Sequence, residues 1–205
     1  MKYANFDYEQ QFWTANKEFI VGIDEVGRGS FAGPLVAAAV IFPKNCKLKY
    51  KLADSKLLTF KKRVEMAEKI KSDAKAFAIA EIDIQIINKI GIGEASHKAF
   101  RKLLKLLTIK PEHILIDGFF IKRINKLDQT PIIHGDQKSA SIAAASIIAK
   151  VYRDNLMIKL DLKYPKYNFR YNMGYGTLKH REAINIHGLS SIHRKSFNLQ
   201  KYINL

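Results

Sequence analysis

Short apolar runs, several of them ending on an acidic residue, set the pattern of the first two thirds of the chain. Residues 18–24 (EFIVGID) and 34–42 (PLVAAAVIF) read as two buried strands that could pair as a hairpin, and residues 76–82 (AFAIAEI) read as a third. Residues 111–117 (PEHILID) and 131–136 (PIIHGD) repeat the arrangement of an apolar run, an aspartate and a nearby glycine. The pattern predicts strands at all five positions, with carboxylates at the ends of three.

Helical spacing fills the segments between and after these runs. It begins near Thr59 in TFKKRVEMAEKIKSD, covers residues 84–107 with an interruption at two glycines, and is clearest in the alanine-rich residues 139–160. Strands and helices in this order predict a mixed sheet with helices on its faces, an α/β or α+β domain. We expect the parallel part of that sheet around the last two strands.

The charge of the chain is strongly positive and unevenly distributed. Lys and Arg number 35 against 19 Asp and Glu, which gives a formal net charge of +16. Residues 44–63 are rich in lysine around a single acid, Asp54, and residues 159–181 mix basic residues with five aromatic ones. This balance favours a polyanionic partner such as nucleic acid or an anionic membrane, and the aromatic rings suit contacts to sugars and bases. The alternatives are a basic surface that serves solubility and rings that point into the core.

The single cysteine and the short apolar runs indicate where in the cell the protein is located. Cys46 is the only cysteine, so an internal disulfide and a cysteine-cluster zinc site are excluded. The first residues carry acids and lack the continuous apolar core of a signal peptide. Uncharged apolar runs such as residues 30–43 fall short of the ~18 to 20 residues that span a bilayer. We therefore expect a cytoplasmic protein without membrane contact.

Four carboxylates fall at or next to the predicted strand ends: Asp24, Glu25, Asp117 and Asp136. Gathered at one edge of a sheet, they would repel one another unless some stay protonated or divalent cations compensate their charge. Hard oxygen ligands suit Mg²⁺ or Mn²⁺, and two ions about 4 Å apart could activate water and stabilise the leaving oxygen in phosphodiester hydrolysis. Each acid alone could instead be a turn, cap or solvated loop residue, so the shared pattern carries the hypothesis.

The turn GIDEVGRGSFAGP at residues 22–34 also permits a different interpretation, a dinucleotide-binding loop. The third glycine, Gly33, comes one residue too late for that fingerprint, and the acid expected about 20 residues further on is missing. Asp24 and Glu25 would in addition repel a pyrophosphate. A dinucleotide-dependent enzyme is therefore the weaker alternative.

Six motifs occur in order along residues 19–197: DEVGRGSFAGPLVAAAV, LADSKLLT, ILIDG, HGDQKSASIAAASIIAKVYRD, MGYGTLKH and HRKSF. Together they resemble bacterial type 2 ribonuclease H, ribonuclease HII. The resemblance implies a ribonuclease H-like α/β fold, a five-stranded mixed sheet flanked by helices with a helical C-terminal part. Residues 19–205 would form this catalytic domain after an N-terminal extension, residues 1–18.

The resemblance also implies an activity and its site. The activity is endonucleolytic hydrolysis of RNA in RNA–DNA hybrids and nicking on the 5′ side of ribonucleotides embedded in duplex DNA, giving 3′-hydroxyl and 5′-phosphate ends. The implied ligands of two Mg²⁺ or Mn²⁺ ions in the substrate complex are Asp24, Glu25, Asp117 and Asp136. The implied substrate-binding residues, which grip the 2′-hydroxyl and junction phosphate or stack on the next sugar, are Gly27, Arg28, Gly29 and Tyr175.

Further residues near these motifs have simpler interpretations. Lys150 and Asp154 lie one helical turn apart and predict an ion pair, with Asp154 as structural support near the site. We expect His134 to shape the turn before Asp136. Nothing in the spacing of His187 and the other histidines requires zinc.

Three remaining questions concern relatives and partners. The sister family, ribonuclease HIII, carries an extra N-terminal domain and a lysine in its glycine loop. This chain instead has Arg28 in that loop and only a short extension, residues 1–17, and both features favour ribonuclease HII. We expect the extension to pack against the body of the protein. The last residues, QKYINL, only loosely suggest a sliding-clamp motif, and we expect them to complete a helix or tail of a monomeric protein. A nucleic-acid binder that has lost catalysis is the remaining alternative, and the presence of all four acids argues against it.

Overall fold

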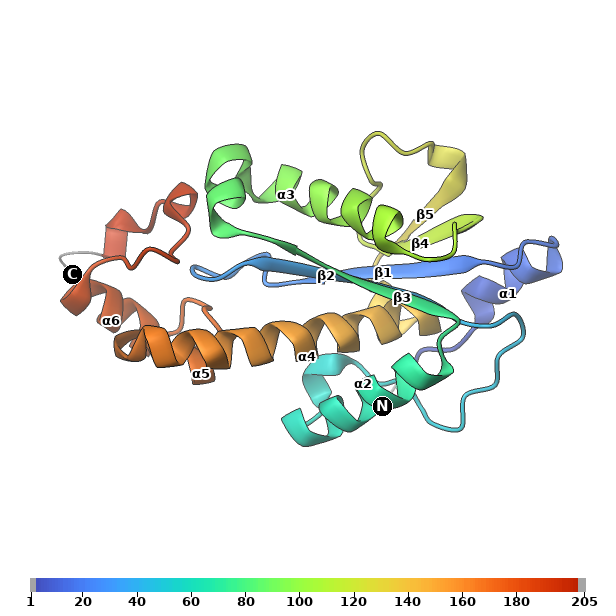
Figure 1. The fold of residues 1–205 in the computed structure, drawn as a ribbon, viewed down its shortest axis with the longest axis horizontal. Coiled ribbons are helices and arrows are strands. Elements are labelled where there is room, and N and C mark those ends of the chain that lie inside the picture. The colour runs from blue at the N-terminus through green and yellow to red at the C-terminus, as the bar shows by residue number, and fades with distance from the viewer. Residues whose placement is uncertain (1–2, 203–205) are drawn as a thin grey trace.

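A five-stranded mixed sheet forms the centre of the molecule, and helices cover both of its faces (Figure 1). The computed structural model describes residues 3–202, with the side chain of Lys56 excepted. The strands lie in the order β3-β2-β1-β4-β5 across the sheet. In chain order the elements are α1 Asp7–Thr14, β1 Ile20–Val26, β2 Leu35–Ile41, α2 Phe60–Asp73, β3 Ala76–Ile82, α3 Ile84–Leu106, β4 His113–Asp117, β5 Gln129–Ile132, α4 Ala140–Lys163, α5 Phe169–Asn172 and α6 Leu178–His187. The predicted α/β fold with a five-stranded mixed sheet is confirmed.

Strand pairing determines where the first two acids lie. β1 is antiparallel to β2 and β2 to β3, while β1 with β4 and β4 with β5 are parallel, as predicted for the last two strands. β2 continues to pair with β1 beyond the predicted strand end, with Asp24 opposite Ala38 and Glu25 opposite Ala37. The first strand therefore extends two residues past its predicted end at Asp24, to Val26, and Glu25 lies within it rather than after it.

The last strand ends earlier than its sequence pattern indicates. β5 stops at Ile132, where its pairing with β4 also stops, so the prediction of a strand up to Asp136 is wrong. The chain then turns at His134, whose φ of 55° is left-handed, and enters a short 3-10 turn, η3 (Gly135–Gln137). Asp136 is therefore held by a turn and not by a strand.

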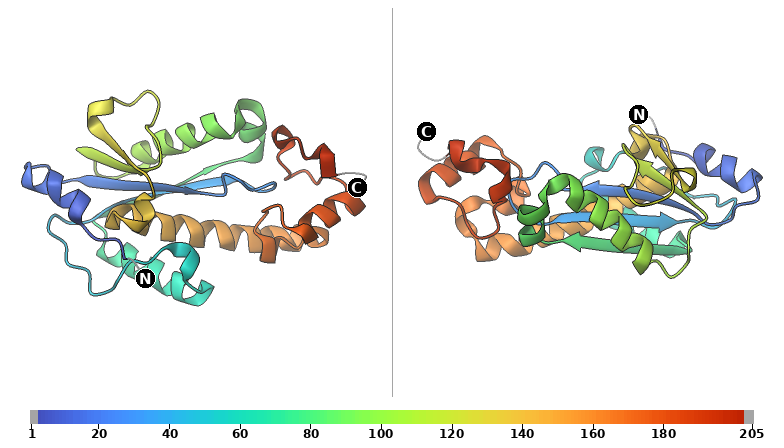
Figure 2. Two further views of the ribbon diagram at one scale, coloured as in Figure 1. Left: turned by 180° about the vertical axis from the view of Figure 1, so that it is seen from behind. Right: turned by 90° about the horizontal axis from the view of Figure 1, so that it is seen from above.

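Alternate side chains of the sheet pack against different helices. α3 lies along one face, and α2 and α4 lie along the other (Figures 1 and 2). Val21 and Ile23 belong to the core under α3, whereas Val36 belongs to the core under α4. α4 approaches β1 very closely, because a Cβ on Gly22 would lie 2.1 Å from the backbone carbon of Ser141. Only glycine permits this approach.

The predicted helices begin at polar caps. Thr59 caps α2 by accepting a hydrogen bond from the backbone N–H of Lys62 at 3.4 Å, and Asp83 caps α3 through two such bonds. α3 is kinked at Gly91, where φ is 76°, and this confirms the predicted interruption. α4 begins after Ser139, as predicted, and runs slightly past the predicted end.

Two smaller groups of elements lie at opposite ends of the sheet (Figure 1). At one end α5, α6 and short 3-10 turns form a helical unit around Phe169 and Ile184, which confirms the helical C-terminal part. Tyr167 is also buried there, whereas Tyr171 is 75% exposed, so the aromatic residues divide between core and surface. At the other end α1 packs against the body through the buried Trp13.

No helix within residues 3–202 combines the length and the apolar character that crossing a bilayer requires.

Candidate active site

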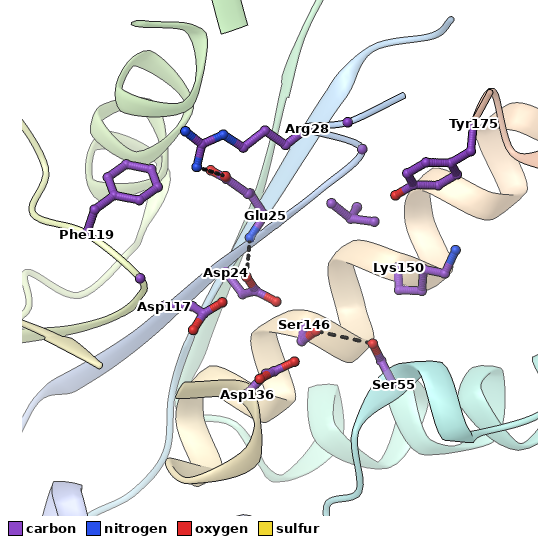
Figure 3. Close-up of a pocket in the computed structure, with 14 residues that line it drawn as sticks. Asp24, Glu25, Arg28, Ser55, Asp117, Phe119, Asp136, Ser146, Lys150 and Tyr175 are labelled. Atoms are coloured by element: carbon purple, nitrogen blue, oxygen red, sulfur yellow. Dashed lines mark hydrogen bonds and ion pairs between the residues drawn. The ribbon is translucent and has the colours of Figure 1, made fainter. Parts of the chain in front are cut away.

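A cavity of roughly 520 Å³ opens where the carboxyl ends of β1 and β4 meet α4 (Figure 3). All the site residues proposed from the sequence line it. They are Asp24, Glu25, Gly27, Arg28, Gly29, Asp117, Asp136 and Tyr175. The same walls include Ser55, Phe119, Ser146 and Lys150. The fold thus brings distant motifs to one place.

The four carboxylates enter this cavity from different directions. Asp24 and Glu25 are neighbours on β1, so their side chains leave the strand on opposite faces of the sheet. Asp24 points into the space shared with Asp117 and Asp136, whereas Glu25 turns toward Arg28 (Figure 3). The acids share the cavity without forming one tight cluster.

Burial dominates the electrostatics of Asp24. The residue is 8% exposed, and its Oδ1 accepts a hydrogen bond from the backbone N–H of Glu25 at 2.7 Å. Burial raises the pKa of Asp24 to about 8 against an opposing hydrogen bond from Ser146, and the charges of Asp117 and Asp136 add to the rise. The carboxyl group is therefore protonated at neutral pH when no cation is bound.

Arg28 is held between a carboxylate and an aromatic ring. Its Nη1 donates to Glu25 Oε1 at 3.4 Å, and its guanidinium carbon lies 4.8 Å from the centre of the Phe119 ring. Phe119 in turn packs edge-on against His97, with ring centres 5.2 Å apart. Burial raises the pKa of Glu25, and the positive charge of Arg28 opposes that rise. Glu25 Oε2 is buried without a hydrogen-bond partner among residues 3–202.

The η3 turn links the two remaining acids. The backbone N–H of Gly135 donates to Asp117 Oδ1 at 2.7 Å, and Asp136 follows directly in the chain. A Cβ on Gly135 would lie 2.7 Å from Ile142 Cδ1, so glycine lets the turn pack closely against the start of α4. His134 is exposed and left-handed at the start of the turn, consistent with the predicted structural role. Asp117 and Asp136 are thus positioned together.

The carboxylates suit a hard divalent cation but are not preassembled around one. Within residues 3–202 no three Asp, Glu, His or Cys side chains are placed closely enough to enclose a metal ion. A cation in the cavity would give the orphaned Glu25 Oε2 a partner. It would also favour the ionised form of Asp24, whose pKa is raised mainly by burial and further by the charges of Asp117 and Asp136. The residues therefore fit Mg²⁺ or Mn²⁺, with side-chain rotation as part of binding.

Two buried arginines fasten the glycine turn to the C-terminal region. Arg153 on α4 donates to the carbonyl oxygens of Ala32 at 3.1 Å and Met173 at 2.8 Å. Arg194 donates to the carbonyl oxygen of Arg28 at 2.9 Å. Both buried guanidinium groups are fully withdrawn from solvent. The turn is therefore held by its backbone, independently of the side chains that face the cavity.

Gly27 and Gly29 of the turn lie in different surroundings, so the lack of a side chain has a different effect at each. Gly27 has a φ of 86°, and a Cβ there would lie 2.1 Å from Arg153 Nε. A side chain at Gly27 would therefore break the arginine clamp. A Cβ on Gly29 would meet nothing within 4 Å, so the missing side chain there leaves space at the cavity wall.

A chain of buried histidines supports Tyr175. His180 Nδ1 lies 2.9 Å from the carbonyl oxygen of Tyr175, which can only accept, so Nδ1 carries a proton. His180 Nε2 must then accept from His193 Nε2, 3.1 Å away, and His193 Nδ1 accepts from the backbone N–H of Ser190 at 2.9 Å. Burial lowers the pKa of His193 to about 4 and also lowers that of His180. Both rings are neutral, and their tautomers are fixed.

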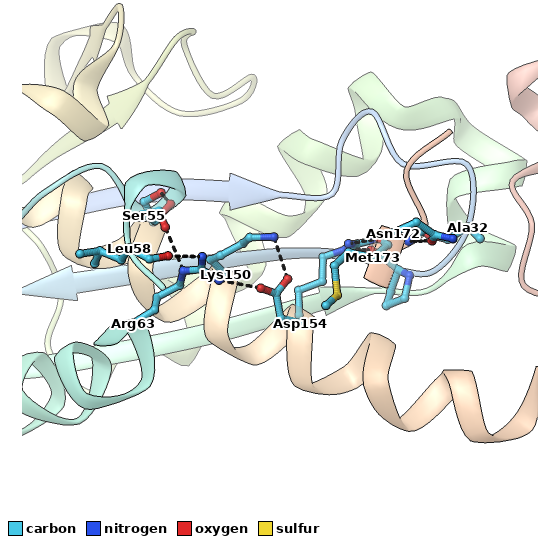
Figure 4. A network of polar contacts seen from close by, with 12 residues as sticks. Ala32, Ser55, Leu58, Arg63, Lys150, Asp154, Asn172 and Met173 are labelled. Atoms are coloured by element: carbon cyan, nitrogen blue, oxygen red, sulfur yellow. Dashed lines mark hydrogen bonds and ion pairs between the residues drawn. The ribbon is translucent and has the colours of Figure 1, made fainter. Parts of the chain in front are cut away.

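A polar network connects α4 to α2 beside the cavity (Figure 4). The predicted ion pair is confirmed, because Lys150 Nζ lies 2.8 Å from Asp154 Oδ1. The buried Arg63 pairs with the other oxygen of Asp154 at 2.8 Å and also donates to the carbonyl oxygens of Ser55 and Leu58. Asp154 therefore serves as structural support, and the network holds the segment that contributes Ser55 to the cavity.

Sequence reasoning missed several residues of the cavity wall. Ser146 and Lys150 line the cavity from α4, and their spacing of four residues, continued by Asp154 outside the cavity, was a usable signal of a polar face within an alanine-rich helix. Ser55 lay in a recognised motif without an assigned role. Phe119 had no signal beyond its place near Asp117, since its contact with Arg28 depends on how two loops fold together.

Known proteins resemble this chain in sequence and in fold. The family model described as Ribonuclease HII matches residues 21–200. Ribonuclease H2 from Pyrococcus horikoshii OT3 has a TM-score of 0.73 and 24% identity, over 89% of this chain and 97% of that one. Ribonuclease HII from Archaeoglobus fulgidus, solved in a complex with PCNA, has a TM-score of 0.71 and 25% identity, over 88% and 96%. Bst-RNase HIII in complex with Mn²⁺ has a TM-score of 0.68 and 21% identity, over 91% and 69%.

Proposed function

The chain belongs to the ribonuclease HII family and is a ribonuclease H, and we propose that it cleaves RNA–DNA hybrids endonucleolytically and nicks duplex DNA on the 5′ side of embedded ribonucleotides. The observation that carries this proposal is the cavity that joins four carboxylates to the glycine turn and Tyr175. The net charge of +16 favours such a polyanionic substrate. The products would carry 3′-hydroxyl and 5′-phosphate ends.

We infer that Asp24, Glu25, Asp117 and Asp136 hold Mg²⁺ or Mn²⁺, with two ions in the substrate complex. Bst-RNase HIII has been solved with Mn²⁺, and carboxylate oxygens suit both ions. When bound, the ions supply an activated water and stabilisation of the leaving oxygen. Asp24 must give up its proton to act as a ligand, because its pKa is about 8. Glu25 offers its free Oε2 while Arg28 holds Oε1.

The ribose would be read by the glycine turn and the tyrosine. The 2′-hydroxyl is the group that distinguishes RNA from DNA at one position. Gly29 leaves the backbone accessible to that hydroxyl, and Arg28 keeps half of its side-chain surface exposed for the junction phosphate. Tyr175 would stack on the sugar of the following deoxynucleotide, where an additional hydroxyl would be hindered.

We further propose that the protein acts as a cytoplasmic monomer in ribonucleotide excision repair and DNA replication. The Archaeoglobus fulgidus relative was solved with PCNA. The segment QKYINL, residues 200–205, is the place in this chain where we would look for a sliding-clamp contact. Residues 203–205 of that segment lie outside the described part of the chain.

A DNA duplex with one embedded ribonucleotide tests the proposal. With Mg²⁺ or Mn²⁺ we expect a single nick at the phosphate on the 5′ side of the ribonucleotide, with a 3′-hydroxyl that a polymerase can extend. Asp136→Asn should abolish the nick and leave duplex binding intact, since the amide preserves shape but removes charge. Asp128→Asn is the matched control, because this aspartate is exposed and lies outside the cavity.

Three results would contradict different parts of the proposal. Binding without cleavage by the folded wild-type protein would favour a nucleic-acid binder that has lost catalysis. A nick at another position would refute the assigned site of cleavage. Cleavage by Asp136→Asn at the wild-type rate would remove that residue from the proposed metal site.

A further inference from the structure

The segment before the family match has its own attachment to the candidate active site. The match begins at residue 21, and the proposed reaction uses no residue from positions 3–17. α1 nevertheless carries a carboxylate, Glu9, that is completely buried. Buried acids are rare unless they are paired, so the partners of Glu9 indicate what the extension does.

Glu9 caps the helix that follows Asp136. Its Oε1 accepts hydrogen bonds from Ser139 Oγ at 2.6 Å and from the backbone N–H of Ser141 at 2.8 Å. Ser139 is the N-cap of α4, and its Oγ accepts from the backbone N–H of Ile142. The first turn of a helix has unpaired N–H groups and partial positive charge, which a carboxylate satisfies. Glu9 therefore anchors α1 to the start of α4.

The residues just before α1 attach to two segments that enter the cavity. Ala4 forms a β-bridge with Leu52, three residues before Ser55, through a backbone hydrogen bond of 3.0 Å. Asn5 forms a bridge with Ser139 through two backbone hydrogen bonds, of 3.3 and 2.7 Å, to the residues on either side of it. Consecutive residues of the extension thus hold both segments.

These attachments reach the carboxylates through a short path. Ser139 N–H donates to the carbonyl oxygen of Gly135 at 2.9 Å, and Gly135 N–H donates to Asp117 Oδ1 at 2.7 Å. Asp136 lies within the same turn. The start of α4 also packs on β1 two residues before Asp24, at Gly22, where the close approach leaves no room for a side chain. A shift of this helix end would move Asp117 and Asp136 relative to Asp24.

We propose that residues 3–17 are a positioning element of the nuclease site, in which Glu9 holds the turn of Asp136 at the spacing that cation binding needs. Glu9 is a positioning residue and not a catalytic one, because it does not line the cavity. This inference rests on the proposed function of the four carboxylates. It assigns a role to a segment that lies before the match to the family model.

The test compares Glu9→Ala and Glu9→Gln in the full-length chain. Mn²⁺ binding is measured by titration calorimetry without nucleic acid, and kcat and KM are measured on the duplex with one ribonucleotide. For Glu9→Ala we expect Mn²⁺ affinity and kcat to fall roughly 10- to 100-fold with KM almost unchanged, the usual effect of losing a residue that orients metal ligands. Glu9→Gln keeps an oxygen that can accept both hydrogen bonds but places amide donors at the buried position of Oε2, so both quantities should lie between those of Glu9→Ala and the wild type.

Leu103→Ala separates positioning from simple destabilisation. Leu103 is buried in the core under α3, away from the turn, so this variant should lower the melting temperature while Mn²⁺ affinity stays at the wild-type value. If Glu9→Ala behaves in the same way, with wild-type Mn²⁺ affinity and kcat, the inference is overturned. If Glu9→Ala does not fold, Glu9→Asp is judged by the same criteria, because its shorter side chain withdraws the carboxylate from α4.

Failure of the proposed function would look different. A folded wild-type protein that neither binds Mn²⁺ nor cuts the duplex would refute the metal site itself before any variant is compared. Metal binding and cleavage by the wild type, with no effect of Glu9→Ala, would refute only the role of the extension.

Discussion

The buried carboxyl group of Asp24 should lower the free energy of unfolding of the metal-free protein. The variant Asp24→Asn, which lacks that group, measures the size of this effect. Burial, with a contribution from neighbouring negative charges, raises the pKa of Asp24 from 3.8 to about 8. The carboxyl group is ionised in the unfolded chain at pH 7, so folding has to add a proton. At about 1.4 kcal/mol per pH unit between 3.8 and 7, this protonation costs at most about 4 kcal/mol of folding free energy.

The sign of the pH dependence follows from the same values. Between about pH 4 and pH 8 the folded state binds more protons than the unfolded state, so wild-type stability falls as the pH rises. Asp24→Asn removes this titration and keeps an oxygen that can accept from the backbone N–H of Glu25. The added amide donors need partners, which offsets about 1–3 kcal/mol of the gain. We expect the variant to be more stable at pH 7 by about 1 to 3 kcal/mol.

Urea unfolding in the presence of EDTA at pH 5, 7 and 8 measures this difference. The advantage of Asp24→Asn should widen across the series, while Asp128→Asn, at an exposed position, should show no such trend. An Asp24→Asn variant that is less stable than the wild type at pH 7 and 8, or a difference that does not change with pH, would refute the reasoning. The stabilised variant should also be unable to cut.

Other measurements address the remaining parts of the site. Mn²⁺ binding at pH 7 should release protons because Asp24 has to ionise, and calorimetry in two buffers of different ionisation enthalpy would contradict this if it detected no release. Phe119→Leu should reduce the preference for a ribonucleotide junction about two- to fivefold in relative kcat/KM, the worth of one exposed cation–π contact to Arg28, and an unchanged preference would refute that role. His193 stays neutral down to about pH 4 in the folded state, whereas in the unfolded chain this histidine takes up a proton below about pH 6.5. Wild-type stability should therefore fall more steeply than that of His193→Gln as the pH is lowered from about 6.5 to 4. Parallel stability curves for the two proteins would contradict the neutral histidine chain.

The parts of the fold that could be predicted from sequence are those with local signals. The strand 76–82 and the kink at Gly91 are marked by alternation and by a residue tolerant of positive φ, and both lie where predicted. The end of the last strand was misplaced because pairing with β4, a tertiary property, decides where β5 stops. The proposed site residues came from motif order and strand ends, and the chain folds so that all of them line one cavity.

What could not be predicted depends on contacts between distant segments. Neighbouring acids on a strand must diverge, yet their partners, Ser146 for Asp24 and Arg28 for Glu25, become known only once the helices and loops are placed. The burial of Glu9 had no sequence signal at all, because an acid in an amphipathic terminal helix usually faces solvent. Its partners lie more than a hundred residues away in the chain.

The length of α4 has a consequence for how the family site can vary. The helix has 24 residues, so it is about 36 Å long, and it starts beside the turn that carries Asp136. Further along, Arg153 ties it to the segment that leads into Tyr175. One inserted residue between these points would advance the far end by about 1.5 Å and rotate it by about 100° about the helix axis. The length of this helix therefore sets the separation between the turn of Asp136 and the segment before Tyr175, and an insertion of about seven residues, close to two full turns, would change that separation while nearly preserving the orientation of the far end.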